Sequence, residues 1–459
     1  MSEAGATKRR WVFRAALVLL VAGIACGVLK IVLFPMGKPS ISVDYAATYN
    51  EQVRPANYDP NGDAAPDYRE ALRRLPTVPD GISIIGHLWE YDPTSVEYRM
   101  LESWLASCEE AIGLLHKAAA KPCFWGRVSS SDPNLPLLLE GFDFGKFGHA
   151  SQCLRYRAEY LGAHGNPAEA FRGIMTGFRM AGQLKNAGRQ CLSIGQFVEI
   201  VTHIAAFDLL TRTNVEATLL GDVQGQLEEI LAAGTVPSFL SDGIVLRDIV
   251  QRAFTDDGKG HGHVLVQTIH DHFKARKTPK SELGANFAYL RHFWLAWNHP
   301  SRRETIQTVD RLTEAASQLI QQTPWELHAK GGNPIERLRE IRGQNAFLGI
   351  TAAEATLAWP IQSYHRNLAS TEALIATMGI LRFHQDKGAW PANLEELAAA
   401  GYIRRVPIDP YSGRPLAYRP AEDSFLLYSC GADFDDDGGT WGQDAKGGDQ
   451  VFWPVGARK

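Results

Sequence analysis

Apolar side chains recur every three or four residues through most of the chain between residues 66 and 359, which is the spacing of one face of an α-helix. A long example begins at Thr94, which can cap a helix, and continues to Ala120. Near the C-terminus the pattern changes, because residues 416–418 and 425–428 are short apolar runs between polar turn residues, as in strands. The sequence therefore predicts a mainly α-helical protein with a small α+β region at its C-terminal end.

The clearest pair of helices is a hairpin with arms at residues 154–161 and 170–184. The residues of its turn have the types expected where one helix ends and the next begins: Gly165, Asn166, Pro167 and Glu169. This hairpin resembles one unit of a tetratricopeptide array. No clear repeat of that period accompanies it, so residues 66–359 are predicted to form an irregular helical domain rather than a solenoid.

A basic cluster followed by an apolar run opens the chain. The cluster consists of Lys8, Arg9, Arg10 and Arg14. It precedes the apolar residues 15–34, which are interrupted only by Lys30, a side chain that can reach a lipid headgroup. About 20 residues at about 1.5 Å each span about 30 Å, the thickness of one bilayer core. We therefore predict a cytoplasmic tail at residues 1–10 and a single-pass transmembrane helix at residues 11–35.

The position of the basic residues also predicts the orientation in the membrane. They lie on the N-terminal side of the apolar run, so the positive-inside rule keeps Met1 in the cytoplasm and places the chain after Pro35 outside it. The body is then extracytoplasmic, in the periplasm. A cleaved signal peptide is the alternative, because the uninterrupted residues 15–29 also have the length of its apolar segment.

Proline and glycine positions predict the domain limits. Residues 36–65 contain several turn residues with little apolar periodicity, which predicts a linker. At Trp359-Pro360 the proline lacks a backbone donor and disfavours helix at the preceding residue. We expect a break or a sharp kink there, between a helical domain at residues 66–359 and an α+β domain at residues 360–459.

The C-terminal region is predicted to contain a helix, a loop, a small antiparallel sheet and an acidic loop, in that order. Apolar residues at helical spacing mark its first helix: Leu374, Ile375, Met378 and Leu381. Gly388 ends that helix, and a short second helix is predicted at residues 393–399. Residues 406–413 are rich in turn-forming types and precede the two strands.

The acidic loop follows the spacing of a calcium-binding loop. Its carboxylates Asp433, Asp435 and Asp437 precede Gly438 in the order D-x-D-x-D-G, and Asp444 falls at the twelfth position. Carboxylates at alternate positions reach one ion if the backbone turns sharply, which glycine permits. The alternative is a solvated acidic turn, since no helix flanks the loop as in an EF-hand.

The sequence of residues 383–452 resembles that of the globular domain of the type II secretion major pseudopilins. Five motifs carry this resemblance: residues 384–391 (HQDKGAWP), 394–397 (LEEL), 406–410 (VPIDP), 413–418 (GRPLAY) and 428–433 (YSCGAD). In that family the loop after the last strand binds calcium, which the resemblance implies for Asp433 and Asp449. The N-terminal processing signal of the family is absent from this chain, so assembly into a pilus is not expected.

Charge and cysteine content narrow the function classes. The net charge of −4 and a pI near 6.4, with scattered basic residues, disfavour nucleic-acid partners. Six cysteines in 459 residues are too few for a disulfide scaffold, and no C-x-x-C spacing occurs. A pair such as Cys108 with Cys123 could oxidise outside the cytoplasm, whereas buried free thiols are the more ordinary state.

Signatures of catalysis are sparse. The histidines His261, His263, His270 and His272 form a cluster that could hold zinc or copper. Residues two apart on a helix point in different directions, so exposed polar positions are the simpler interpretation. Neither G-x-S-x-G, nor H-E-x-x-H, nor a glycine-rich phosphate loop occurs.

These patterns favour a non-enzymatic protein tethered to the membrane, with an extracytoplasmic helical body for interactions with envelope proteins and a calcium-stabilised C-terminal domain. One alternative is an exported hydrolase or carbohydrate-active enzyme with its site in the helical domain. Another is a minor component of a secretion or pilus apparatus.

The predicted topology is testable with reporter fusions. We expect a periplasmic reporter at the C-terminus to be active and a cytoplasmic one to be inactive, because the basic cluster holds the N-terminus inside. The protein should also stay with the membrane pellet after a carbonate wash. The opposite reporter pattern would reverse the orientation, and release by carbonate would exclude the anchor.

Overall fold

The computed structural model of the chain describes residues 20–25, 27–30, 32–34, 37–56, 58–83, 86–129, 138–139, 144–234, 236–269, 271, 282–441 and 447–454. They divide into two units. The larger unit comprises Tyr45–Val245, Arg311–Ile341 and Glu354–Lys459, and the smaller unit comprises Met1–Asp44, Leu246–Asp310 and Arg342–Ala353. Both are mainly helical, as the apolar periodicity predicts.

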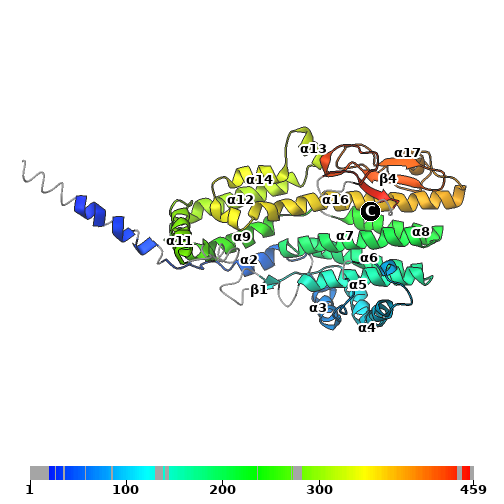
Figure 1. The fold of residues 1–459 in the computed structure, drawn as a ribbon, viewed down its shortest axis with the longest axis horizontal. Coiled ribbons are helices and arrows are strands. Elements are labelled where there is room, and N and C mark those ends of the chain that lie inside the picture. The colour runs from blue at the N-terminus through cyan, green and yellow to red at the C-terminus, as the bar shows by residue number, and fades with distance from the viewer. Residues whose placement is uncertain are drawn as a thin grey trace, which may run out of the picture. The chain divides into compact units, whose positions relative to one another are not determined.

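The elements are labelled in Figure 1. The α-helices are α2 (Tyr45–Gln52), α3 (Ala65–Arg74), α4 (Val96–Ala119), α5 (Phe144–Ala163), α6 (Pro167–Lys185), α7 (Arg189–Arg212), α8 (Ala217–Ala233), α9 (Leu240–Ala253), α11 (Glu282–Trp297), α12 (Arg302–Leu319), α13 (Pro324–Ala329), α14 (Pro334–Arg342), α15 (Ala346–Ile350), α16 (Ala353–Lys387) and α17 (Leu394–Ala399). Short 3₁₀ helices lie at Pro60–Gly62, Leu88–Glu90 and Gly431–Asp433. The strands are β1 (Val128–Ser129), β2 (Leu138–Leu139), β3 (Ala417–Pro420), β4 (Phe425–Ser429) and β5 (Gln450–Trp453).

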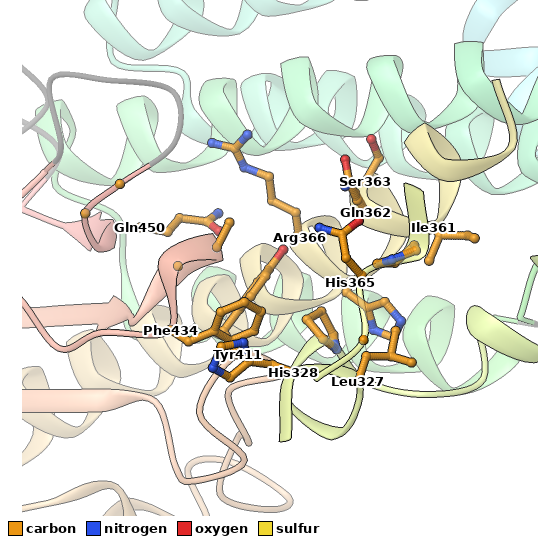
Figure 2. Close-up of a pocket in the computed structure, with 18 of the residues that line it drawn as sticks. Leu327, His328, Ile361, Gln362, Ser363, His365, Arg366, Tyr411, Phe434 and Gln450 are labelled. Atoms are coloured by element: carbon orange, nitrogen blue, oxygen red, sulfur yellow. The ribbon is translucent and has the colours of Figure 1, made fainter. Parts of the chain in front are cut away.

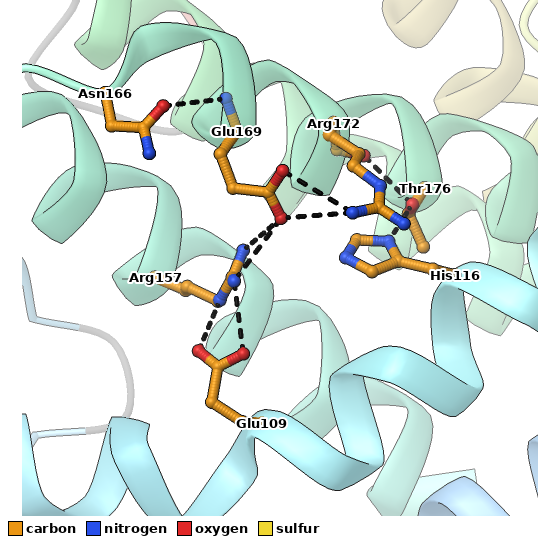
Figure 3. A network of polar contacts seen from close by, with 7 residues as sticks. All are labelled: Glu109, His116, Arg157, Asn166, Glu169, Arg172 and Thr176. Atoms are coloured by element: carbon orange, nitrogen blue, oxygen red, sulfur yellow. Dashed lines mark hydrogen bonds and ion pairs between the residues drawn. The ribbon is translucent and has the colours of Figure 1, made fainter.

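The predicted hairpin is formed by α5 and α6, and its corner is shown in Figure 3. Gly165 has a φ of 74°, and the Asn166 side chain accepts a hydrogen bond from the Glu169 N–H at 3.3 Å. The Glu169 carboxylate does not return to the cap as in a capping box but binds Arg157 and Arg172, each at 3.4 Å. The turn is therefore confirmed, and its acidic residue links neighbouring helices.

Helix α7 passes through the core of the larger unit. Among the described residues, Cys191–Arg212 is the helix that is long and apolar enough to cross a membrane, but 72% of its apolar window is buried within the protein. It packs closely on α6 because Gly177 has no side chain, and a Cβ there would collide with Thr202. We therefore interpret α7 as a core helix.

The N-terminal apolar run is helical where it is described, at residues 20–25, 27–30 and 32–34. This described part is shorter than a membrane span. Its side chains are open to the surroundings, with Leu20 and Ile24 about 60% exposed. The transmembrane helix at residues 11–35 stays a prediction.

The helix is not broken at Trp359-Pro360, where the sequence predicts a break or a sharp kink. Helix α16 continues from Ala353 to Lys387 with Pro360 inside it. A proline inside a helix costs about 3 kcal/mol through the lost donor and a clash with the preceding turn. Residues 369–380 of the same helix are all buried, and burial of this length of helix offsets the local cost.

The C-terminal elements follow the predicted order, and β5 joins them as a third strand. The sheet has the order β3-β4-β5 with antiparallel pairs, including Tyr418 opposite Leu427 and Tyr428 opposite Val451. Gly388, with a φ of 69°, ends α16 as expected. These findings confirm a small antiparallel sheet near the C-terminus.

One hydrophobic core joins this sheet to the helices that precede it. Phe452 on β5 stacks on Phe207 of α7, with ring centroids 6.0 Å apart, and both side chains are buried. Apolar residues of α5, α6, α7, α8, α16, α17, β4 and β5 belong to the same buried cluster. Residues 66–359 and 360–459 therefore do not pack as two separate cores.

The cysteines are free thiols where the structure describes them. Cys108 on α4 is a buried free thiol and forms no disulfide with Cys123. Cys123 donates its thiol hydrogen to the Gly62 carbonyl at 3.5 Å. Both cysteines are therefore free thiols, the more ordinary of the two predicted states.

We predict that Phe452→Ala destabilises the whole larger unit by about 3–5 kcal/mol, the usual cost of truncating a buried aromatic side chain. Urea denaturation followed by far-ultraviolet circular dichroism and tryptophan fluorescence should give coincident transitions, both shifted to lower urea. Leu240→Ala, at a position 60% exposed, should change stability by less than about 0.5 kcal/mol. Loss of the fluorescence transition alone, with the helical signal unchanged, would show that the sheet unfolds independently.

Candidate functional site

A cavity of about 840 Å³ lies in the larger unit against one side of α16 (Figure 2). Its walls come from α13 and the loop that follows, from the N-terminal half of α16 and from loops of the C-terminal region. Two of these loops approach each other closely, because a Cβ at Gly431 would collide with the Gly448 carbonyl oxygen. Both glycines have positive φ values, 74° and 96°. Its volume falls within the range of about 300–1,000 Å³ found for small-molecule pockets.

Four polar side chains of the cavity wall are more than nine-tenths buried: Ser363, His365, Tyr411 and Asp449. Carbonyls of Ile320 and Gln322 lie near His365, but neither ring nitrogen reaches hydrogen-bond geometry with a described residue. Burial lowers the pKa of His365 to about 4, so the ring is neutral at pH 7. Buried polar atoms without partners are uncommon in proteins, and here they mark the cavity wall.

Aromatic side chains form the apolar part of the wall. Phe434 stacks on His328 with centroids 4.0 Å apart and an interplanar angle of 13°. Phe434 has a φ of 66°, a left-handed conformation that is costly for a residue with a Cβ. Trp359 is 41% exposed, which leaves an indole face open to a ligand.

Arg366 is the cation of the cavity wall. Its side chain is exposed, and its guanidinium makes no hydrogen bond or ion pair with any residue that the structure describes. Burial raises the pKa of Tyr411, and the charge of Arg366 lowers it, to a net value of about 12. The Tyr411 hydroxyl is therefore protonated at pH 7 and available as a donor beside Arg366 (Figure 2).

The acidic loop borders the cavity at Asp449. Asp433 accepts hydrogen bonds from the N–H groups of Gly448 and, at 3.4 Å, Asp435. Asp449 accepts one from Gly439 N–H at 2.6 Å, so the two carboxylates tie the two ends of the loop together.

The predicted ligands do not all converge. Asp435 and Asp437 are exposed, and Asp444 lies outside the described residues. Among the described residues, no three carboxylates of this loop have oxygens within 4.8 Å of one another. Asp436, which the spacing did not select, accepts hydrogen bonds from the Tyr428 hydroxyl at 2.8 Å and from Gly438 N–H at 3.0 Å.

Asp449 has the environment of a cation ligand. It is 1% exposed, and its Oδ1 has no hydrogen-bond partner among the described residues. Burial raises the pKa of Asp449, the backbone N–H groups of Gly439 and Asp437 oppose this, and the charges of Asp436 and Asp437 add to the rise. A bound cation would remove both the repulsion and the cost of lost hydration at Asp449.

A second polar cluster lies between α5, α7 and the segment before α4. His87 Nδ1 lies 3.2 Å from Glu159 Oε1 and 3.3 Å from Asp208 Oδ2. Among the described residues these three have the spacing of metal ligands. Arg155 occupies the same space, with Nη1 2.9 Å from His87 Nδ1 and 3.2 Å from Glu159 Oε1. The guanidinium supplies the positive charge, so we interpret this cluster as an ion-pair network.

The network attaches the loop at Leu88–Glu90 to the helices. Glu159 accepts the Leu88 N–H at 2.7 Å, and the His87 ring stacks on Trp89 at 4.1 Å. Arg212 covers the other indole surface at 3.8 Å. Burial lowers the pKa of His87, but hydrogen bonds and charges of Asp208 and Glu159 more than offset this and raise it to about 9.

The histidine cluster of the smaller unit does not form a described metal site. His270 and His272 lie outside the described residues, and His261 is exposed. Both ring nitrogens of His263 have protein neighbours, since Nε2 lies 3.0 Å from the Phe34 carbonyl oxygen and Nδ1 lies 3.2 Å from Thr255 Oγ1. We therefore interpret His263 as a polar residue packed against its neighbours rather than as a metal ligand.

Sequence reasoning missed the cavity residues and the His87 network. A signal for the network exists, because Arg155, Glu159 and Asp208 interrupt apolar helical stretches. The cavity residues have no comparable signal, since they come from segments far apart in the chain. No protein-family model, curated protein or solved structure matches this chain.

We predict that His87 makes stability depend on pH. Its folded pKa of about 9 exceeds the ordinary 6.5, so its contribution is complete below about pH 6.5 and is lost as the pH rises through about 9. The free energy of unfolding should fall across this window by on the order of 2–3 kcal/mol. Urea denaturation at several pH values tests this. His87→Gln should flatten the dependence and the exposed-site control His164→Gln should not, whereas equal slopes in wild type and His87→Gln would contradict the assignment.

Proposed function

We propose that this chain is a membrane-anchored, extracytoplasmic structural or interaction protein whose pseudopilin-like C-terminal region is stabilised by calcium. The observation that carries the proposal is the buried Asp449 oxygen, which lacks a hydrogen-bond partner among the described residues and lies at one end of the acidic loop. A desolvated carboxylate of this kind is stable when a cation compensates it.

The calcium ligands would come from both ends of the loop. Asp449 would supply its free Oδ1, and Asp433, which holds Gly448, would approach from the other side. Asp435 and Asp437 have exposed side chains that are free to turn inward. Calcium accepts six to eight oxygen ligands in flexible geometry, so carbonyls and water would complete its coordination.

The arrangement of C-terminal elements supports the pseudopilin-like part of the proposal. A long helix, a short second helix and an antiparallel sheet precede or enclose the acidic loop, in the order that the resemblance implies. The sheet packs on the helical body through a common core, so the loop would stabilise the body as well. This coupling suits a structural part of the cell envelope.

No observation favours hydrolysis at the His87 network. A hydrolase needs a carboxylate free to act as acid, base or nucleophile in contact with substrate. Glu159 is engaged by Arg155, His87 and the Leu88 N–H, and its side chain is 2% exposed. A structural role for this network is therefore preferred to catalysis.

We predict that calcium raises the thermal midpoint of the full chain in detergent relative to chelator. At 100 times the dissociation constant the stabilisation should be about 2.7 kcal/mol, because the ion binds only the folded loop. Differential scanning calorimetry provides the measurement.

Variants then locate the ion. Asp449→Asn and Asp433→Asn should each abolish most of the calcium-dependent shift, while Asp423→Asn, at an exposed turn before β4, should keep it. Equal midpoints for wild type in calcium and in chelator would make the loop a solvated acidic turn.

A further inference from the structure

We propose that the cavity beside α16 binds a small carboxylate with an aromatic or apolar body. The carboxylate would pair with Arg366 and the Tyr411 hydroxyl, and the body would lie against Trp359 and neighbouring apolar groups. None of these three residues is a candidate calcium ligand, but the sign of the ligand charge rests on the proposed function, in which a cation compensates the carboxylate of Asp449 in the same cavity wall.

The sign of the ligand charge follows from the ionisable groups that face the cavity. They are Arg366, His328, His365, Tyr411 and Asp449. His365 is neutral, and Asp449 already accepts the Gly439 N–H and is the candidate cation ligand. With a cation at Asp449, Arg366 is the remaining permanently charged group of the wall without a partner among the described residues, and it attracts an anion.

The type of anion follows from the donors. A guanidinium presents parallel N–H groups that match the two oxygens of a carboxylate. Tyr411 adds an O–H donor, 6% exposed as a residue and without a hydrogen bond to any described residue. A carboxylate uses these donors fully, whereas a neutral amide would place an N–H against donors and leave them unsatisfied.

The apolar wall sets the body of the ligand. Trp359 offers an exposed indole surface, and the stacked pair of Phe434 and His328 forms a second flat surface. Leu327 and Pro324 line the same cavity. Flat apolar groups pack favourably on such surfaces, and the volume of about 840 Å³ accommodates a ring system with substituents.

The left-handed backbone at Phe434 supports a built site. An L residue with a φ of 66° costs of order 1–3 kcal/mol, and such strain is typical of ligand sites. The conformation holds the ring against His328 at the cavity wall. The unpartnered ring nitrogens of the buried His365 give the wall a further polar group.

The test uses 4-fluorophenylacetate and its neutral amide, 4-fluorophenylacetamide, with the full chain in detergent. Fluorine NMR line broadening measures the affinity of each probe, in calcium and in chelator separately. We expect the carboxylate to bind at least tenfold more tightly than the amide. Equal binding of the two probes, or no binding of the carboxylate at millimolar concentration, overturns the proposal.

Variants locate the probe. Arg366→Gln should weaken binding of the carboxylate at least tenfold, Arg366→Lys less, and Tyr411→Phe several-fold. The matched control Arg337→Gln changes an exposed arginine on α14 outside the cavity and should leave the affinity unchanged. Unchanged affinity in Arg366→Gln would overturn the proposal. Circular dichroism shows whether each variant is folded, and substitution of the unpaired, exposed Arg366 should preserve the fold.

Discussion

Burial of α16 on two sides is the constraint on which the larger unit depends. Small residues let its neighbours approach closely, and a Cβ at Gly379 would meet Ile403 and Leu397. On another side, Gln385 donates to the Val215 carbonyl and Arg382 to Gln224 on α8. A helix with apolar residues around most of its surface is stable only when it is covered on several sides. The sheet and the helical body are thus halves of one core.

The fold was predictable where a side chain acts on its own backbone. Asn166 caps α6 and Gly388 ends α16 because these choices are local. The predicted start of α4 was one residue early. Ser95 rather than Thr94 caps the helix, because the Ser95 hydroxyl accepts a hydrogen bond from the Tyr98 N–H. At Pro360 the prediction considered only the local penalty of a few kcal/mol for proline in a helix. The free energy gained by burying the rest of α16 offsets that penalty and cannot be read from the local sequence.

The candidate site was less predictable than the fold. The spacing selected Asp433 and Asp437, and the resemblance added Asp449. That Asp449 is buried whereas Asp437 is exposed becomes evident only from the folded structure. Arg366 on α16 and Tyr411 in a distant loop become neighbours through the packing of the C-terminal region on that helix. A single sequence contains no periodicity that records such a pairing.

The joining of early and late segments in one core has a consequence for synthesis. Phe207 on α7 is made long before Phe452, the residue that covers it. During translation the apolar surface of α5 to α8 therefore lacks its final partner until almost the entire chain has emerged. Exposed surface of this kind favours aggregation and engages chaperones. The core of the larger unit can therefore close only after β5 has been synthesised.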